Sequence, residues 1–161
     1  MKTFLRFLQF LALGAWLGAI LYFSIIVTQG AFGILTLDQA GALVRFTLRG
    51  LHWMGLMAAL VYLIAAVAQE MSPKALIKPA SIGVMLMFLL TAVSQRVVIQ
   101  RMDALRMQMV SVEATPTDDP RRAEFDRLHG YSVDLEAGVL LIGLASLFLA
   151  AREVGKSNRT V

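Results

Sequence analysis

The sequence contains no cysteine, and it has few charges for its size. Of its 161 residues, 16% are charged and 58% are hydrophobic. The absence of cysteine excludes disulfides, thiolate nucleophiles, cysteine-ligated zinc and iron–sulfur clusters. So apolar a composition also excludes an ordinary soluble domain, a disulfide-stapled scaffold, a collagen-like chain and a disordered chain.

Charge is absent from four long segments of the chain. These segments cover residues 7–37, 50–69, 79–95 and 137–151, together about half of the sequence. A membrane-spanning helix needs roughly 17 to 25 predominantly apolar residues. The sequence therefore predicts an all-α fold, an integral membrane four-helix bundle in one domain with up-down-up-down topology. We expect the spans at about residues 7–34, 50–69, 79–98 and 129–151.

Short signals predict where the helices begin. Thr36 and Gln39 have the spacing of a capping box, so the second helix should start near residue 37. Pro79 suits the first turn of the third helix, and Asp119 followed by Pro120 predicts a cap and first turn for the fourth. Helices two and four should thus begin outside the bilayer, and an apolar stripe after Arg96 predicts that helix three extends beyond it on the same side.

Two further patterns concern packing. Gly14 and Gly18 form a GxxxG pattern, which permits close approach of another helix. An apolar stripe at helical spacing continues the third helix beyond the membrane. It comprises Val98, Met102, Leu105, Met109 and Val112. This stripe is a candidate surface for a protein partner.

The net charge of +4 fits a membrane surface better than a nucleic acid, because no basic patch is interleaved with exposed aromatic residues. All four lysines, at positions 2, 74, 78 and 156, fall on the side of the two termini. The positive-inside rule therefore favours a multi-pass protein of the cell membrane, as in a cell inner membrane, with both termini cytoplasmic. Membrane lipid is the expected partner, and a homo-oligomer is left open.

Polar side chains converge at one level of the predicted bundle. His52 opens the second span one turn after Arg49, and Arg96 ends the apolar part of the third. On the fourth helix, His129, Ser132 and Glu136 share a face, and Asp134 lies on a neighbouring stripe. Intramembrane carboxylates and imidazoles commonly serve as proton or metal groups. We therefore predict that these residues bind a small ligand or cation near one leaflet, in transport or resistance.

Alternative readings remain open at this point. His52 and His129 could ligate a b-type haem in an electron-transfer protein, or hold a metal ion. The same residues could instead lie at the headgroup level and pair with carboxylates or lipid phosphate. A structural role, with a partner on the extension of helix three, is the third alternative. No phosphate loop, nucleophile elbow or other catalytic motif is present, which favours a non-enzymatic protein.

Three segments resemble the transmembrane-protein-205-like family, which is also catalogued as a domain of unknown function. They are FDRLHGYSVDLEAG, RGLHWMG and LRFLQFLALGAWLGAILYF. The resemblance implies a four-span membrane protein with a eukaryotic relative linked to resistance against platinum drugs. It matches family positions at His52, Gly55, His129, Gly130, Ser132 and Gly138. The sequence departs from the family at Gln29-Gly30, where Ala-Pro is expected, and at Glu136, where Asn is usual. Because Glu136 is not a family residue, the histidines are the stronger candidates for a function shared by the family.

Overall fold

The computed structural model describes residues 1–157, and all the regular secondary structure in them is helical. Its elements, in chain order, are α1 (Lys2–Tyr22), the π-helix η1 (Phe23–Val27), α2 (Thr28–Ile34), α3 (Leu37–Glu70), the 3₁₀-helix η2 (Pro73–Ile77), α4 (Pro79–Val93), the π-helix η3 (Ser94–Val98), α5 (Ile99–Gln108) and α6 (Pro120–Ser157). They form four long helical stretches, Lys2–Ile34, Leu37–Glu70, Pro79–Gln108 and Pro120–Gly155, each long and apolar enough to cross a membrane. The prediction of an all-helical chain with four helices long and apolar enough to span a membrane is thus confirmed.

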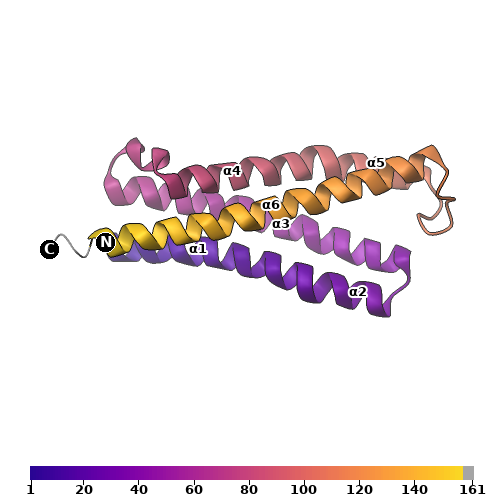
Figure 1. Ribbon diagram of the computed structural model, residues 1–161, viewed down its shortest axis with the longest axis horizontal. Coiled ribbons are helices and arrows are strands. Elements are labelled where there is room, and N and C mark those ends of the chain that lie inside the picture. The colour runs from indigo at the N-terminus through magenta and orange to yellow at the C-terminus, as the bar shows by residue number, and fades with distance from the viewer. Residues whose placement is uncertain (158–161) are drawn as a thin grey trace.

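The helices lie side by side along the long axis of the molecule (Figure 1). The N-terminus, the end of α6 and the connection between α3 and α4 lie at one end of the bundle. The connection between α2 and α3 and the loop between α5 and α6 lie at the other. Helix α3 packs against both α1 and α4, and α6 packs against α4, α5 and α1. The bundle therefore has two distinct ends, which differ in the polar groups they carry.

The predicted helix starts are confirmed. Thr36 caps α3, because its hydroxyl accepts from the Gln39 N–H at 3.4 Å and the Gln39 side chain accepts from the Thr36 N–H at 3.3 Å. Pro79 occupies the first turn of α4, where its missing N–H leaves no helical bond unmade. The Asp119 carboxylate accepts from the backbone N–H of Arg121 at 2.8 Å and so caps α6. Local chemistry alone therefore fixes where three of the four helical stretches begin.

The core is built where helices approach closely, and the glycines that permit this are not the predicted ones. A Cβ at Gly55 would lie 2.3 Å from the indole nitrogen of the buried Trp16, so α3 can meet α1 only with glycine there. At Gly14 and Gly18 a Cβ would meet nothing within 4 Å. The GxxxG pattern thus does not mark a close contact among residues 1–157, because α1 turns a different face inward. That face carries Leu13, Trp16, Leu17 and Ile20.

The apolar stripe beyond the third span is an internal seam. Its members Leu105, Met109 and Val112 are buried together with Phe125 of α6. The prediction that the helix continues through Val112 is wrong, because α5 ends at Gln108. Asp38 at the start of α3 holds this part of the loop by accepting hydrogen bonds from the Ser111 hydroxyl and, at 3.2 Å, the Val112 N–H.

A protein partner on this extension, as the stripe suggested, would have to use other residues, because α6 already covers the stripe. The side chain of Lys156, one of the four lysines used for the sidedness prediction, lies outside the described residues.

Candidate functional site

A buried polar group joins three helical elements inside the bundle. The side chain of His52 on α3 is only 1% exposed. Its Nδ1 lies 2.9 Å from Oε1 of Gln95 on η3, and its Nε2 lies 3.3 Å from Oε2 of Glu136 on α6. Both ring nitrogens of His52 are therefore held by side chains from other elements. The three residues His52, Gln95 and Glu136 are called the triad below.

The π-helix η3 positions Gln95 in the triad. A π-turn adds one residue to a helical turn. Such turns are rare in proteins, and those that occur are often found at functional sites. Within η3, Ser94, Gln95 and Val98 are buried, whereas Arg96 and Val97 are exposed. The widened turn therefore directs the amide towards His52 while it keeps the neighbouring arginine at the surface.

The chemistry of the triad allows a proton to be held in more than one way. With His52 protonated and Glu136 ionised, both ring N–H groups donate, one to the Gln95 carbonyl oxygen and one to the carboxylate. In that state the two charges cancel. With the proton on Glu136, both side chains are uncharged, so the net charge is zero in either state. Both states avoid an isolated charge in an apolar interior, where such a charge is strongly disfavoured. The Glu136 side chain is 13% exposed, so the carboxylate is the more accessible partner.

Two further hydroxyl groups lie close in sequence to Gln95. Thr91 Oγ1 and Ser94 Oγ are buried, and neither has a hydrogen-bond partner among the described residues. A buried hydroxyl without a partner costs roughly 1–3 kcal/mol. These oxygens can therefore take part in binding a polar ligand or ion without giving up an existing hydrogen bond.

The structure brings together some of the predicted site residues and separates others. His52 and Glu136 are in contact, and Ser132 is buried one turn before Glu136 on α6. His129 and Asp134 are exposed on the same helix, with no hydrogen bond among the described residues. Of these five predicted residues, His52, Ser132 and Glu136 are thus withdrawn from solvent, whereas His129 and Asp134 lie at the surface.

The two predicted arginines lie outside the triad. Arg96 is exposed. Arg49 donates to Oδ2 of Asp103 at 2.9 Å, and Arg45 donates to Oδ1 of the same carboxylate at 3.3 Å. These ion pairs tie α3 to α5 at the bundle end next to the triad. Arg49 thus pairs with a carboxylate outside the triad.

The positions of the two histidines differ from those that a shared haem or metal ion would require. A haem held by both histidines would need His52 to release Gln95 or Glu136, and the exposed His129 to turn inward. Among residues 1–157, no group of three or more His, Asp or Glu side chains is arranged to hold a metal ion. In this conformation the described residues offer one histidine and one carboxylate, not a bis-histidine site.

Sequence reasoning missed Gln95 as a site residue. The signal was present, because Ser94 and Gln95 directly precede the arginine that ends an apolar run. The missing element was the π-turn, since a regular helix gives no reason to aim position 95, rather than a neighbouring position, at His52.

Comparison with known proteins gives a family and no further relative. A search of the curated proteins and a search of the solved structures find no match to this chain. A family match covers residues 11–111. That segment contains His52 and Gln95 of the triad and ends before α6, which contributes Glu136. Because the match spans more than half of the chain, the protein belongs to the family described as Domain of unknown function (DUF4149).

Proposed function

We propose that this integral membrane protein binds a small hard cation at the triad in exchange for a proton, and that it acts in transport or resistance. The observation that carries the proposal is the buried contact of His52 with Glu136, 3.3 Å apart within an apolar bundle. Ionisable groups inside a membrane are expensive, and they commonly mark ion or proton pathways. A pair of this kind therefore needs a role beyond packing.

The donor set supports a hard cation. Glu136 and Gln95 supply side-chain oxygens to the triad. Thr91 and Ser94, within one helical turn of Gln95 in sequence, have buried hydroxyl oxygens without a hydrogen-bond partner among residues 1–157. Oxygen ligands suit ions such as Na⁺ and K⁺, whereas soft metals prefer thiolate or thioether groups. A bound cation next to the carboxylate would repel a protonated imidazole, so His52 would release its proton. The exchange keeps the net charge of the buried site constant.

The membrane arrangement proposed with this function follows the charge pattern. The four stretches cross the cell membrane up-down-up-down, and both termini lie in the cytoplasm. Support comes from the lysines at the terminal end and from the side-by-side helices in Figure 1. The likeness to the transmembrane-protein-205-like family supports a role in resistance, and the triad gives that role a chemical basis.

Calorimetric titration of the purified protein in detergent tests the proposal. Na⁺, K⁺ and tetraethylammonium chloride are titrated separately, each in two buffers with different ionisation enthalpies. The difference in heat between the buffers gives the number of protons released per cation bound. We expect at least one of the alkali cations to bind and to release about one proton, because the triad exchanges one charge for another.

The chain supplies matched controls for both ionisable residues. Glu136→Gln and His52→Gln should abolish the proton release, whereas Asp134→Asn and His129→Gln should keep it, because the latter two side chains are exposed on the same helix. The proposal fails if neither Na⁺ nor K⁺ releases a proton from the unaltered protein, or if Glu136→Gln releases as many protons as Asp134→Asn.

A further inference from the structure

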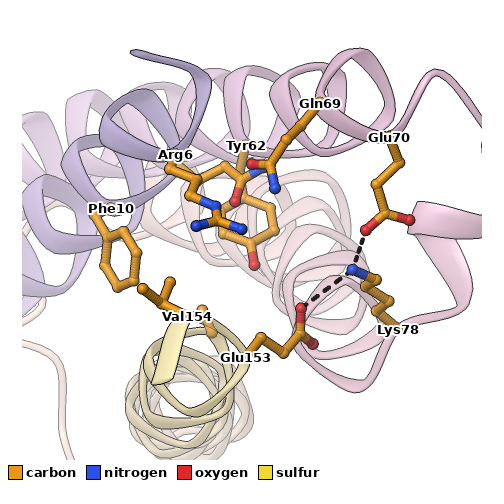
Figure 2. Close-up of a pocket in the computed structure, with 10 residues that line it drawn as sticks. Arg6, Phe10, Tyr62, Gln69, Glu70, Lys78, Glu153 and Val154 are labelled. Carbon is orange, nitrogen blue, oxygen red and sulfur yellow. Dashed lines mark hydrogen bonds and ion pairs between the residues drawn. The ribbon is translucent and has the colours of Figure 1, made fainter. Parts of the chain in front are cut away.

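A second polar site lies at the other end of the bundle, where the two termini meet. Tyr62, which lies in it, follows His52 by ten residues on α3, about 15 Å along the helix. The site is a cavity of about 280 Å³ between α1, α3, α6 and Lys78, the residue just before α4. Its polar lining comprises Arg6, Gln9, Tyr62, Gln69, Glu70, Lys78 and Glu153. Figure 2 shows these side chains, except Gln9, as labelled sticks around the opening.

One wall of the cavity carries more acid than base. The Lys78 ammonium pairs with the Glu70 carboxylate and, at 3.4 Å, with that of Glu153 (Figure 2). The hydrogen bond to Glu70 raises the pKa of Lys78, so its ammonium stays charged at neutral pH. Two carboxylates thus share one lysine, which leaves this wall with an excess negative charge.

The other wall carries a cation and neutral donors. Arg6 on α1 lines the cavity and has no carboxylate partner among the described residues. Tyr62 is 4% exposed, and its hydroxyl has no hydrogen bond among those residues. Gln69 accepts a hydrogen bond from Gln9 at 3.4 Å through its carbonyl oxygen, which leaves its N–H₂ group available. The cavity therefore combines hydrogen-bond donors with excess carboxylate, and the Tyr62 ring lies between Arg6 and the Lys78–Glu153 pair (Figure 2).

The cavity lies at the level where the apolar helices end. Arg6 directly precedes the first charge-free segment, Glu70 directly follows the second, and Lys78 directly precedes the third. Charged residues that flank spans mark the membrane–water interface. On α1, next to the cavity, Phe4, Phe7 and Leu11 are more than half exposed. Lipid tails could cover these apolar side chains while a headgroup enters the cavity.

We propose that this cavity binds a zwitterion that carries a primary ammonium and a phosphate, the chemistry of a phosphoethanolamine headgroup. The phosphate meets the Arg6 guanidinium, the Tyr62 hydroxyl and the Gln69 amide. The ammonium donates to the carboxylates of Glu153 and Glu70. A volume of about 280 Å³ is at the small end of ligand sites, which suits a headgroup better than a larger solute. This inference does not rest on the function proposed for the triad.

Native mass spectrometry of the purified protein tests this proposal. The probes are phosphatidylethanolamine, phosphatidylcholine and phosphatidylglycerol with identical acyl chains. Phosphatidylcholine lacks ammonium N–H donors, and phosphatidylglycerol lacks the ammonium. We expect phosphatidylethanolamine to bind about tenfold more tightly than either, the size expected for a charge-assisted hydrogen bond. Equal binding of the three lipids would overturn the proposal.

Single substitutions test which residues hold the phosphate and which hold the ammonium. Arg6→Gln should weaken phosphatidylethanolamine about tenfold, and Glu153→Gln should remove its advantage over phosphatidylcholine. Arg152→Gln is the matched control, because Arg152 is exposed at the same end and stacks on Phe148 outside the cavity. Tyr62→Phe keeps the ring and removes only the hydroxyl, so it tests the site should Arg6→Gln fail to fold. If Arg6→Gln or Tyr62→Phe binds lipid as Arg152→Gln does, the assignment is wrong.

A soluble competitor separates the two sources of this chemistry. O-phosphoethanolamine is added at millimolar concentration to the lipid-bound protein. Displacement that is lost in Arg6→Gln identifies the headgroup alone as sufficient, and the natural ligand can then be a soluble phosphoethanolamine. Selective lipid binding without displacement shows that the acyl chains on α1 contribute and that the ligand is a phospholipid. Either result supports the site, whereas displacement that is equal in Arg6→Gln and Arg152→Gln contradicts it.

Discussion

The inward and outward faces of α6 carry the same kinds of side chains in opposite surroundings. Glu136 contacts the buried His52, whereas Asp134, two residues earlier, is exposed. Ser132 is buried, and His129, one turn before it, is exposed. The residue type alone therefore does not make a site. A carboxylate or an imidazole acquires distinctive chemistry only where a neighbouring helix removes it from solvent and supplies a partner.

The largest expected difference between an inward and an outward side chain is found on α5, at its seam with α6. Leu105 is buried against Phe125, and Met107, two residues later, is exposed. Leu105→Ala should lower the free energy of unfolding by about 2–5 kcal/mol, because it removes buried methyl groups and leaves a cavity. Met107→Ala should change it by no more than about 0.5 kcal/mol. Denaturation in mixed micelles, followed by circular dichroism, measures both. Equal effects would mean that α6 does not cover this stripe.

The next difference concerns the two carboxylates themselves. Glu136→Ala removes a partner from a ring nitrogen of His52, which is buried, so it should destabilise the protein by roughly 1–3 kcal/mol. Asp134→Ala should fall within about 0.5 kcal/mol of the unaltered protein, as surface changes do. The same denaturation experiment compares them. A larger loss for Asp134→Ala than for Glu136→Ala would reverse the assignment of the inner face.

Two glycines of α6 should respond with opposite signs. A Cβ at Gly143 would lie 2.4 Å from Leu17 and 2.8 Å from Met87, whereas one at Gly138 would meet nothing within 4 Å. Gly143→Ala should destabilise by about 1 kcal/mol, the lower end of overpacking costs, because the tips of both neighbours can shift. Gly138→Ala should stabilise by up to about 1 kcal/mol, because alanine favours the helix. The thermal unfolding midpoints of the two variants in detergent, relative to the unaltered protein, measure these effects. Midpoint shifts of the same sign would contradict the packing described.

The smallest effect is expected at the start of α6, where Asp119 is the cap. Hydrogen bonds from the Arg121 side chain and backbone lower the pKa of Asp119 from 3.8 to about 2. A lowered folded-state pKa stabilises the fold above the ordinary value, so this contribution is present above about pH 4 and is lost as the pH falls towards about 2. Asp119→Asn keeps the acceptor and removes the charge.

The Asp119 effect is measured as the difference in unfolding midpoint between the unaltered protein and Asp119→Asn at a series of pH values. The difference should shrink as the pH falls from 5 to 2. A difference that stays constant over this range would show that the carboxylate charge does not contribute to the cap.

Sequence reasoning reached those features that depend on a few neighbouring residues. The capping box at Thr36, the proline at position 79 and the cap at Asp119 are local, so their spacing was sufficient to locate three helix starts. The four apolar helical stretches followed from the distribution of charge. The sequence also placed His52 and Glu136 in one polar site, because both lie where a predicted span begins.

The features that were missed depend on which helix lies opposite. His129 shares a face with Glu136 by spacing, but it lies seven residues, about 10 Å, before it on α6, where the structure leaves it exposed. Gly14 and Gly18 suggested a contact, whereas Gly55 provides one because it meets Trp16. Gln95 required the π-turn of η3. The spacing of residues along one helix does not predict any of these three features, because each depends on the neighbouring helix or on a local π-turn.

Nitrogen NMR of the histidine rings tests the central claim most directly, because the chain has only two histidines. Protein labelled with ¹⁵N-histidine is studied in detergent, and His129→Gln assigns the signals. We predict slowly exchanging ring N–H signals from His52, which is buried and hydrogen-bonded on both sides, and none from His129. Glu136→Gln should shift the His52 nitrogens, whereas Asp134→Asn should not. If His52 exchanges as fast as His129, or if Glu136→Gln leaves its ring signals unchanged, the buried pair does not exist as described.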